Sequence, residues 1–197
     1  MNKKKAFSAL AREAAACTLC PRMADQPAVL SKGNGSLDAR VVFVAEAPGR
    51  FGSGRTGIPF YGDKSGDNFQ ELIDHVGLSR SEIFITNAVL CNPLADGVNS
   101  RPTAKEMKNC SAYLHAVLEL IAPRLVVTLG TVGLDAVNRL LGTRYKLSEQ
   151  AAKVITTPGF RLLPLYHPSP RVANWRRPLA RQKKDFQLII KALNKAA

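Results

Sequence analysis

Short apolar segments alternate with amphipathic segments along this chain of 197 residues. The amphipathic segments carry apolar side chains at helical spacing, and Thr103 with Glu106 forms a capping box at the start of one of them. Strands separated by helices pair in parallel through right-handed crossovers. We therefore predict one domain over residues 1–197, a three-layer α/β/α sandwich around a four-stranded, mainly parallel sheet. The predicted strands are 40–45, 82–90, 124–130 and 160–168.

The carboxyl ends of these strands are the expected place for a ligand, because ligands of parallel α/β sheets bind beyond those ends. The four predicted strands end at Glu46, Asn87, Gly130 and His167. Each residue alone is typical of a helix cap or a loop hydrogen bond. Together, a carboxylate, an amide and an imidazole at one edge of the sheet predict an active site.

The chain is strongly basic, with 28 Lys and Arg against 15 Asp and Glu and a net charge of +13. This balance favours an acidic partner, most often nucleic acid, over a generally basic surface. No apolar run approaches the roughly 20 residues of a membrane-spanning helix. The N-terminal stretch carries Arg12 and Glu13 after its lysines, which is typical of an amphipathic helix rather than a signal peptide. We expect a cytoplasmic monomer that does not bind a membrane.

The four cysteines of the chain are Cys17, Cys20, Cys91 and Cys110. The first two form a C-x-x-C pair, which can bind one metal atom through two thiolates. The other two can complete a four-thiolate site for zinc or for an iron–sulfur cluster. The alternative is a redox pair and two unrelated buried cysteines. Because every cysteine belongs to the possible set, we favour a metal site, and the spacing alone leaves zinc and iron–sulfur open.

Four stretches of the chain carry motifs that occur in this order. They are AEAPG (45–49), RTGIPFYGDKSG (55–66), ITNAVLC (85–91) and HPSP (167–170). Together with the cysteine pattern, they resemble the iron–sulfur branch of the uracil-DNA glycosylase superfamily, often called families 4 and 5. The base-stacking loop, 55–66, follows the family 5 pattern closely. The resemblance covers most of the chain.

This resemblance implies a function and a cofactor. The function is that of a monofunctional enzyme of base-excision repair, which flips uracil out of DNA and hydrolyses its bond to deoxyribose. The partner is DNA that contains uracil or another damaged base. The cofactor is a [4Fe–4S] cluster with a structural role, held by Cys17, Cys20, Cys91 and Cys110.

The resemblance also implies roles for five residues around the flipped base. Phe60 would stack on the base, Asn87 would read its edge, and His167 would donate a hydrogen bond to its O2 as negative charge develops. Asp63 matches a family 5 aspartate and is our first choice for activating the water, with Glu46 second. The alternatives are core packing for Phe60, a turn cap for Asn87, a packed structural role for His167 and a helix cap for Asp63.

The chain departs from the family at the first motif. Ala47 stands where the best-known members have an aspartate, and Gly49 stands where many have a tyrosine that rejects thymine. We expect both positions to contact the substrate in a roomier pocket. Hypoxanthine, hydroxymethyluracil and ethenocytosine, which have precedents in family 5, are then plausible substrates besides uracil.

A second departure follows the HPSP motif, where many relatives carry a leucine wedge. Here the residue is Arg171, and the segment 171–178 also carries Arg176 and Trp175. We interpret this loop as a DNA-penetrating or DNA-clamping segment, with Ser169, Arg171 and Arg176 contacting DNA. The alternative is a solvated basic loop with Trp175 packed inward.

Two other functions stay open. One is a strict uracil-only enzyme of the family 4 type, in which Glu46 is the main carboxylate. The other is a metal-bearing DNA-binding module without turnover, which stays open because Ala45 stands where the first motif usually has glycine and Ala47 departs from the family as well.

Overall fold

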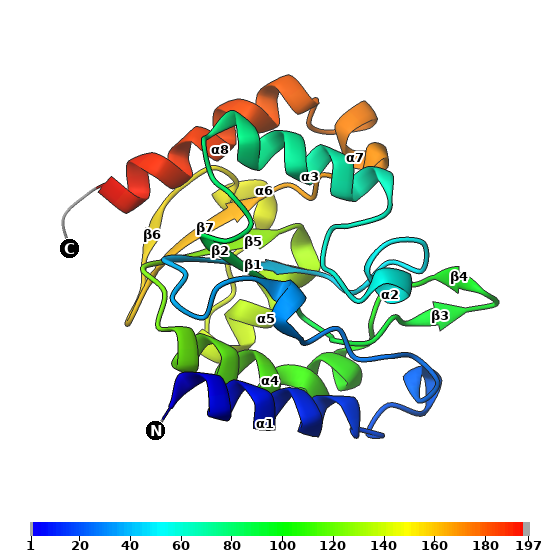
Figure 1. Cartoon of the computed structure of the whole chain (residues 1–197). Coiled ribbons are helices and arrows are strands. Elements are labelled where there is room, and N and C mark those ends of the chain that lie inside the picture. The colour runs from blue at the N-terminus through cyan, green and yellow to red at the C-terminus, as the bar shows by residue number, and fades with distance from the viewer. Residues whose placement is uncertain (1, 195–197) are drawn as a thin grey trace.

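The computed structural model describes residues 2–194, and at its centre is a five-stranded sheet with the order β2-β1-β5-β7-β6 (Figure 1). β6 (Ile155–Thr156) pairs antiparallel with β7 at one edge. The predicted sandwich is confirmed, but the predicted number of strands is one too low, because a two-residue strand is too short to leave a periodic pattern. The four parallel strands are β1 (Val41–Ala45), β2 (Ile83–Asn87), β5 (Leu125–Leu129) and β7 (Arg161–Leu165).

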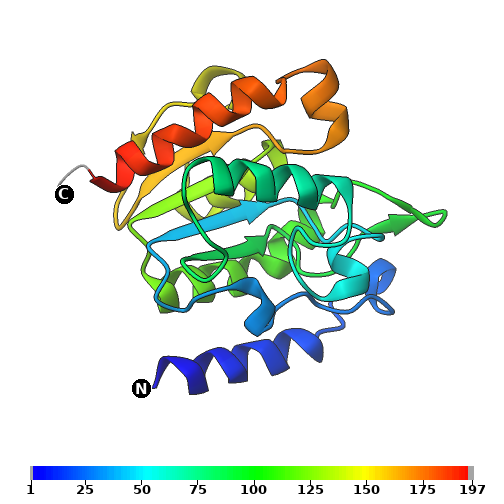
Figure 2. The same ribbon diagram turned by 45° about the horizontal axis from the view of Figure 1, so that its top comes forward.

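Helices cover both faces of this sheet (Figures 1 and 2). Side chains alternate between the faces along β1: Val42 and Val44 pack in one hydrophobic cluster, and Val41 and Phe43 pack in the other. The first cluster is completed by α1 (Lys3–Ala15), α4 (Ala104–Ile121) and α5 (Thr131–Leu141). The second is completed by α3 (Lys64–His75) and α8 (Leu179–Asn194).

Side-chain caps fix where two of these helices begin. Before α4, the Thr103 hydroxyl accepts from the Glu106 N–H at 3.2 Å, and the Thr103 N–H donates to the Glu106 carboxylate at 2.7 Å. The predicted capping box is therefore confirmed. α3 begins at Lys64 because Asp63 caps it, with its Oδ1 accepting from the Gly66 N–H at 2.9 Å.

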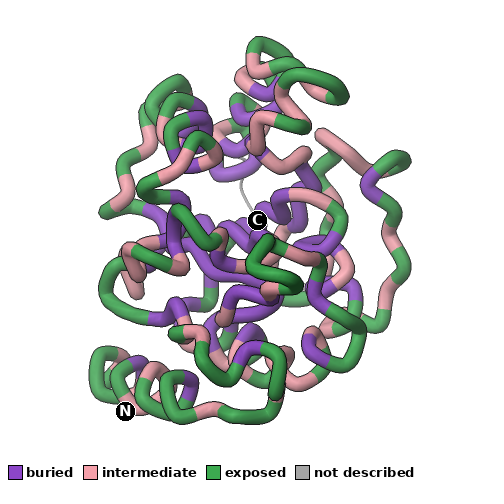
Figure 3. Tube along the Cα trace, turned by 90° about the vertical axis from the view of Figure 1, so that its right-hand side faces the viewer, coloured by how far each residue is buried: buried purple, intermediate pink, exposed green. Residues whose placement is uncertain are grey.

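Several short elements lie at the carboxyl ends of the parallel strands, on the right of Figure 1. Figure 3 faces this end, where mostly exposed and half-buried segments surround the buried strands. The short elements there are α2 (Ser53–Thr56), the hairpin β3 (Leu94–Ala95) and β4 (Val98–Asn99), and α7 (Pro170–Trp175). The remaining short elements are η1 (Pro21–Met23), η2 (Lys32–Asn34) and α6 (Leu147–Gln150). Within residues 2–194, no helix has the length and apolar character needed to cross a membrane.

Candidate active site

A cleft of about 860 Å³ opens at the carboxyl ends of the parallel strands. Asn87 ends β2, Glu46 directly follows β1, and His167 lies two residues past β7, so distant segments meet here as predicted. Every residue predicted to contact the base or the DNA lines the cleft: Glu46, Ala47, Gly49, Phe60, Asp63, Asn87, His167, Ser169, Arg171 and Arg176.

His167 is a neutral imidazole in this cleft. Burial lowers its pKa from 6.5 to about 4. Its Nδ1 accepts a hydrogen bond from the backbone N–H of Ser169 at 3.1 Å. The ring hydrogen of the neutral form is therefore on Nε2. At neutral pH, His167 is thus a hydrogen-bond donor that carries no charge.

Asn87 offers a buried donor that lacks a partner. The residue is 5% exposed, and its Nδ2 makes no hydrogen bond within the part of the chain that the structure describes. Such an unpaired group costs about 1–3 kcal/mol. The other unpaired buried side-chain atoms belong to Thr86, Thr128 and Gln182, and none of these three residues lines the cleft. A ligand in the cleft can therefore pair with the Asn87 amide, which does not serve as a turn cap.

Phe60 contributes to the core and to the cleft at once. One side of its ring stacks on Phe69, with centroids 4.5 Å apart and planes 15° apart. Its centroid lies 5.4 Å from that of His167, and the residue is 9% exposed on the cleft wall. The core-packing alternative thus describes one side of the ring, and the remaining exposed surface faces the cleft.

The backbone around Phe60 is held in an unfavourable conformation. Phe60 has a φ of 50°, a left-handed value that costs energy for a residue with a side chain. The Arg80 guanidinium fixes this turn by donating to the carbonyls of Pro59 at 2.8 Å and Phe60 at 2.5 Å. A Cβ on Gly66 would come within 2.6 Å of the Phe60 carbonyl oxygen, so glycine is required there. Sequence reasoning missed Arg80, because its partners are about 20 residues away and no local pattern marks them.

Asp63 caps α3 and also lines the cleft, so the helix-cap alternative is correct but incomplete. Its Oδ1 is used by the cap, and its Oδ2 lies against two glycines. An added Cβ would come 2.3 Å from Oδ2 at Gly52 and 3.2 Å from it at Gly49. The departure to glycine at position 49 therefore makes room for the Asp63 carboxylate.

Glu46 is a partly buried carboxylate on the same cleft. Burial raises its pKa, and the positive charge of Arg101 opposes this effect. Arg101 itself pairs with Asp135 at 3.0 Å. Glu46 is thus a carboxylate with a weakened preference for the ionised form.

The four cysteines line one small cavity together with Met23, Val89 and Asn109. Burial and then the neighbouring thiols raise the pKa of Cys91 to about 11, as expected for thiols that lie close together. Two amides approach sulfur at 3.4 Å: Asn109 Nδ2 approaches Cys20 Sγ, and the Leu90 N–H approaches Cys110 Sγ. The structure thus brings the four cysteines together around one cavity, with an amide donor beside two of the sulfur atoms. Among residues 2–194, no three or more His, Cys, Asp or Glu side chains are arranged to hold a metal ion.

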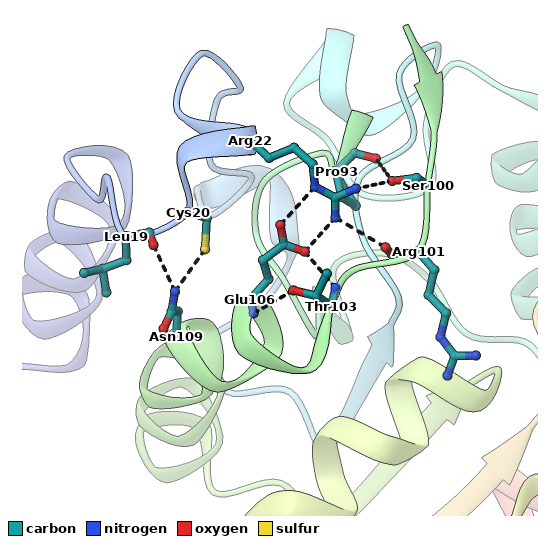
Figure 4. A network of polar contacts seen from close by, with 9 residues as sticks. All are labelled: Leu19, Cys20, Arg22, Pro93, Ser100, Arg101, Thr103, Glu106 and Asn109. Atoms are coloured by element: carbon teal, nitrogen blue, oxygen red, sulfur yellow. Dashed lines mark hydrogen bonds and ion pairs between the residues drawn. The ribbon is translucent and has the colours of Figure 1, made fainter. Parts of the chain in front are cut away.

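A network of polar contacts ties the cysteine segment to the cleft (Figure 4). Arg22, two residues after Cys20, pairs with the Glu106 carboxylate through Nε at 3.0 Å and Nη2 at 2.6 Å. It also donates to Ser100 Oγ at 2.5 Å and to the Arg101 carbonyl at 3.4 Å. Ser100 and Arg101 line the cleft, so Arg22 connects two sites that are far apart in sequence.

The hairpin β3–β4 was also missed, although the sequence contains a signal for it. Asp96-Gly97 joins the two strands, and a D-G dipeptide favours a two-residue turn with positive φ at both positions. The observed φ values are 50° and 71°. Arg50 fixes the turn by donating to the Gly97 carbonyl.

The segment predicted as a basic loop after HPSP is partly helical, because Pro170 suits the first position of α7. Trp175 is 84% exposed, so the alternative in which it packs inward is wrong. Arg171, Trp175 and Arg176 line the cleft.

The fold and the cleft define an α/β/α protein whose ligand site lies at the carboxyl ends of parallel strands. The family model described as the Uracil DNA glycosylase superfamily matches residues 32–194. The chain belongs to this superfamily.

Curated relatives agree with this family. A type-5 uracil-DNA glycosylase of Pyrobaculum aerophilum is 36% identical over 156 residues, covering 73% of this chain and 67% of the relative. A type-4 uracil-DNA glycosylase of Thermotoga maritima is 33% identical over 166 residues, which cover 84% of this chain and 82% of the relative. A type-5 uracil-DNA glycosylase of Thermus thermophilus is 30% identical over 185 residues, which cover 78% of this chain and 83% of the relative. The resemblance to families 4 and 5 is confirmed.

Proposed function

We propose that this protein removes uracil from DNA by hydrolysing its N-glycosidic bond and leaves an abasic site. The relatives' names support this activity. The observation that carries the proposal is the unpaired, buried Asn87 amide in a cleft that also holds Phe60 and His167. A flat base with a polar edge can stack on Phe60 and form hydrogen bonds with Asn87 and His167.

The proposed base contacts follow from the chemistry of each group. Phe60 stacks on the flipped base with the part of its ring that faces the cleft. Asn87 pairs with the base edge, where uracil offers the O4 acceptor and the N3–H donor. The Nε2–H of His167 donates to O2 as negative charge moves onto the departing base.

The proposed carboxylate for the sugar and the water is Asp63. Its Oδ1 is fixed by the helix cap, which leaves Oδ2 for a water on the cleft side. As the glycosidic bond breaks, the sugar approaches an oxocarbenium ion, which a nearby carboxylate stabilises. Glu46 is the second choice, because burial makes its ionised form less favourable.

We further propose that the reaction is monofunctional. Cleavage of the strand through a Schiff base requires an amine at the sugar. No lysine is among the described residues that line the cleft. An abasic site is then the final product.

The base range is proposed to extend beyond uracil. Ala47 places little side-chain volume on the cleft wall, so a larger or substituted base finds room there, whereas the space beside Gly49 is taken by the Asp63 carboxylate. Hypoxanthine, hydroxymethyluracil and ethenocytosine are the candidates.

A [4Fe–4S] cluster bound by Cys17, Cys20, Cys91 and Cys110 completes the proposal. Its contribution is structural: it crosslinks the N-terminal segment to the segment after β2 and to α4. We also propose a cytoplasmic monomer whose Ser169, Arg171 and Arg176 contact the DNA strand beside the target base.

The test is incubation of the purified protein with a uracil-containing oligonucleotide, followed by alkali. We expect strand breaks at uracil, none in the matched thymine oligonucleotide, and about 10²–10³-fold slower excision by His167→Ala. Binding of uracil DNA without breaks would instead support the DNA-binding module without turnover, which the departures at Ala45 and Ala47 leave open. A panel of modified bases in the same assay defines the base range, and strict uracil preference would refute a wider one.

A further inference from the structure

Arg80 holds the turn that carries Phe60 from outside the cleft. It lies between α3 and β2 and is not among the described residues that line the cleft. Besides its contacts to the carbonyls of Pro59 and Phe60, its Nε donates to the Gln70 Oε1 at 2.8 Å. Gln70 belongs to α3, so one guanidinium connects the Phe60 turn to this helix.

This arrangement is costly for a cation. Arg80 is half-buried, and within residues 2–194 its hydrogen bonds all go to neutral oxygens rather than to a carboxylate. Burial lowers its pKa, because a charge removed from water loses hydration. What the planar guanidinium provides in return is a fork of donors that can fix two carbonyls at once.

Arg80 contacts Phe60 from the backbone side and from the ring side. The Phe60 backbone is in the left-handed conformation, which needs outside contacts to persist. The Arg80 guanidinium also lies 5.9 Å from the centroid of the Phe69 ring, and Phe69 is the ring on which Phe60 stacks. Without Arg80 the turn can relax toward a favourable backbone conformation, and the Phe60 ring then changes its position on the cleft wall.

We propose that Arg80 is a positioning residue that fixes the Phe60 ring for stacking on the flipped base. That a base occupies this place rests on the proposed function. A surface that is fixed before binding pays no ordering cost when the base arrives, and so it binds the base more tightly. Arg80 contacts neither the base nor the sugar, and it acts only through the Phe60 turn.

A double-mutant cycle of Arg80 with Phe60 tests this role. The probe is a duplex with 2′-fluoro-2′-deoxyuridine, which resists hydrolysis because fluorine disfavours the oxocarbenium ion. The reference is the same duplex with thymidine at that place. Phe60→Leu keeps an apolar side chain without an aromatic face, and it should weaken binding to the uracil duplex about 5- to 150-fold. Arg80→Met should weaken it about 3- to 30-fold.

The coupling between the two substitutions is the decisive quantity. In the Phe60→Leu protein, Arg80→Met should change the affinity for the uracil duplex by less than about twofold, because no aromatic face remains to be positioned. Independent effects, in which the two losses of affinity multiply, would overturn the proposal. Equal affinities of the wild type and Arg80→Met for the uracil duplex would overturn it as well.

Arg40→Met is the matched control for a general loss of stability. Arg40 Nη2 also donates to a backbone carbonyl, that of Leu193, at 3.1 Å. It directly precedes β1, at the end of the sheet opposite the cleft, and it does not line the cleft. Arg40→Met should leave the affinity for the uracil duplex unchanged, even if it lowers the melting temperature. A loss as large as that of Arg80→Met would show that the effect of Arg80 is only structural.

Gln70→Ala is a milder variant, which decides the question even if Arg80→Met does not fold. It removes the acceptor of the Arg80 Nε and an exposed donor to Asp74, and it leaves both carbonyl contacts in place. It should weaken binding to the uracil duplex about 2- to 10-fold, and this effect should disappear in the Phe60→Leu protein. The same loss in both backgrounds would overturn the proposal.

Steady-state kinetics on uracil-containing DNA provide a second readout. Stacking on the base acts before and during the chemical step alike, so Arg80→Met should raise KM and leave kcat within about twofold. A fall in kcat at unchanged KM would contradict a role in positioning Phe60.

The binding cycle itself needs no turnover. If the wild type releases no uracil but the cycle shows the expected coupling, the proposed function fails and this inference stands. If the wild type releases uracil and the substitutions at Arg80 and Phe60 act independently, the inference fails and the proposed function stands.

Discussion

At the scale of single residues, we propose that Asn87 serves substrate binding rather than the stability of the fold. Asn87→Ala removes a buried donor that has no partner. We therefore expect the free energy of unfolding to change by less than about 1 kcal/mol. Uracil excision should fall by about tenfold or more, because the base edge loses its partner. Urea unfolding and single-turnover excision provide the two measurements.

Asn34 is the matched control for Asn87, being equally buried but fully paired. Its Nδ2 donates to the Ile85 carbonyl at 2.7 Å, and its Oδ1 accepts from the Ser31 N–H at 2.8 Å. Asn34→Ala should therefore cost about 2–4 kcal/mol of unfolding free energy. Equal destabilisation by the two substitutions would contradict our account of Asn87.

His167 makes stability depend on pH in a defined direction. Its pKa is about 4 in the folded protein against 6.5 as the ordinary value, so between these values the unfolded chain binds more protons. The contribution of neutral His167 to the free energy of unfolding is complete above pH 6.5 and is lost as the pH falls toward 4. His167→Gln should flatten this part of the curve of melting temperature against pH. The exposed control His115→Gln should follow the wild type, and parallel curves for all three proteins would contradict the assignment.

Much of the site was predictable at this scale because it depends on strand order. Parallel strands bring their carboxyl ends to one edge of the sheet, so the strand order alone predicts that Glu46, Asn87 and His167 meet. Arg80 and Arg22 were not predictable, since Arg22 pairs with Glu106 across 84 residues and no local pattern reports such a contact.

At the scale of elements, the contacts of Arg22 join η1, α4 and the segment between β4 and α4. Its hydrogen bonds lower the pKa of the buried Glu106 below the ordinary value of 4.5. The ionised Glu106 therefore stabilises the fold at pH values above 4.5, and this stabilisation is lost as the pH falls below 4.5 and Glu106 takes up a proton. Arg22→Ala should cost about 1–3 kcal/mol at pH 7 and reduce the acid sensitivity of the fold. It should also raise KM, because Ser100, which follows β4 and lines the cleft, loses its contact to Arg22. Urea unfolding at pH 7 and pH 4 checks the first two effects.

The exposed pair Lys146–Glu149 provides the comparison. Lys146→Ala should cost no more than about 0.5 kcal/mol. A cost equal to that of Arg22→Ala would show that burial of Glu106 is not what makes the Arg22 contacts strong.

The elements themselves were predictable where they are long and periodic. The capping box at Thr103 fixed the start of α4 correctly, because it is a local hydrogen-bond pattern. β6 left no pattern in its two residues and depends on its pairing with β7. The hairpin had a local signal in Asp96-Gly97, but its two-residue strands have no apolar alternation to support it.

At the scale of the whole molecule, the cysteine cavity connects α4 and the segment after β2 to the N-terminal part of the chain. With the proposed cluster bound, the protein should absorb visible light and contain about four iron atoms per chain. Cys110→Ser should lower the iron content and the melting temperature together. Asn109→Ala removes a donor to Cys20 Sγ and to the Leu19 carbonyl but no cysteine, and it should keep the iron while changing the reduction potential or the rate of cluster loss. Iron-free protein with the stability of the wild type would contradict the proposed cluster.

The central claim is that the cleft hydrolyses the bond to uracil with Asp63 as the carboxylate that activates water. Single-turnover uracil release by Asp63→Asn, measured beside the wild type and Glu46→Gln, tests it most directly. Asparagine is as good a helix cap as aspartate, so the melting temperature should stay the same. The rate should fall by about 10²–10⁴-fold, with a smaller loss in Glu46→Gln. Wild-type rates in the Asp63→Asn protein would contradict the claim.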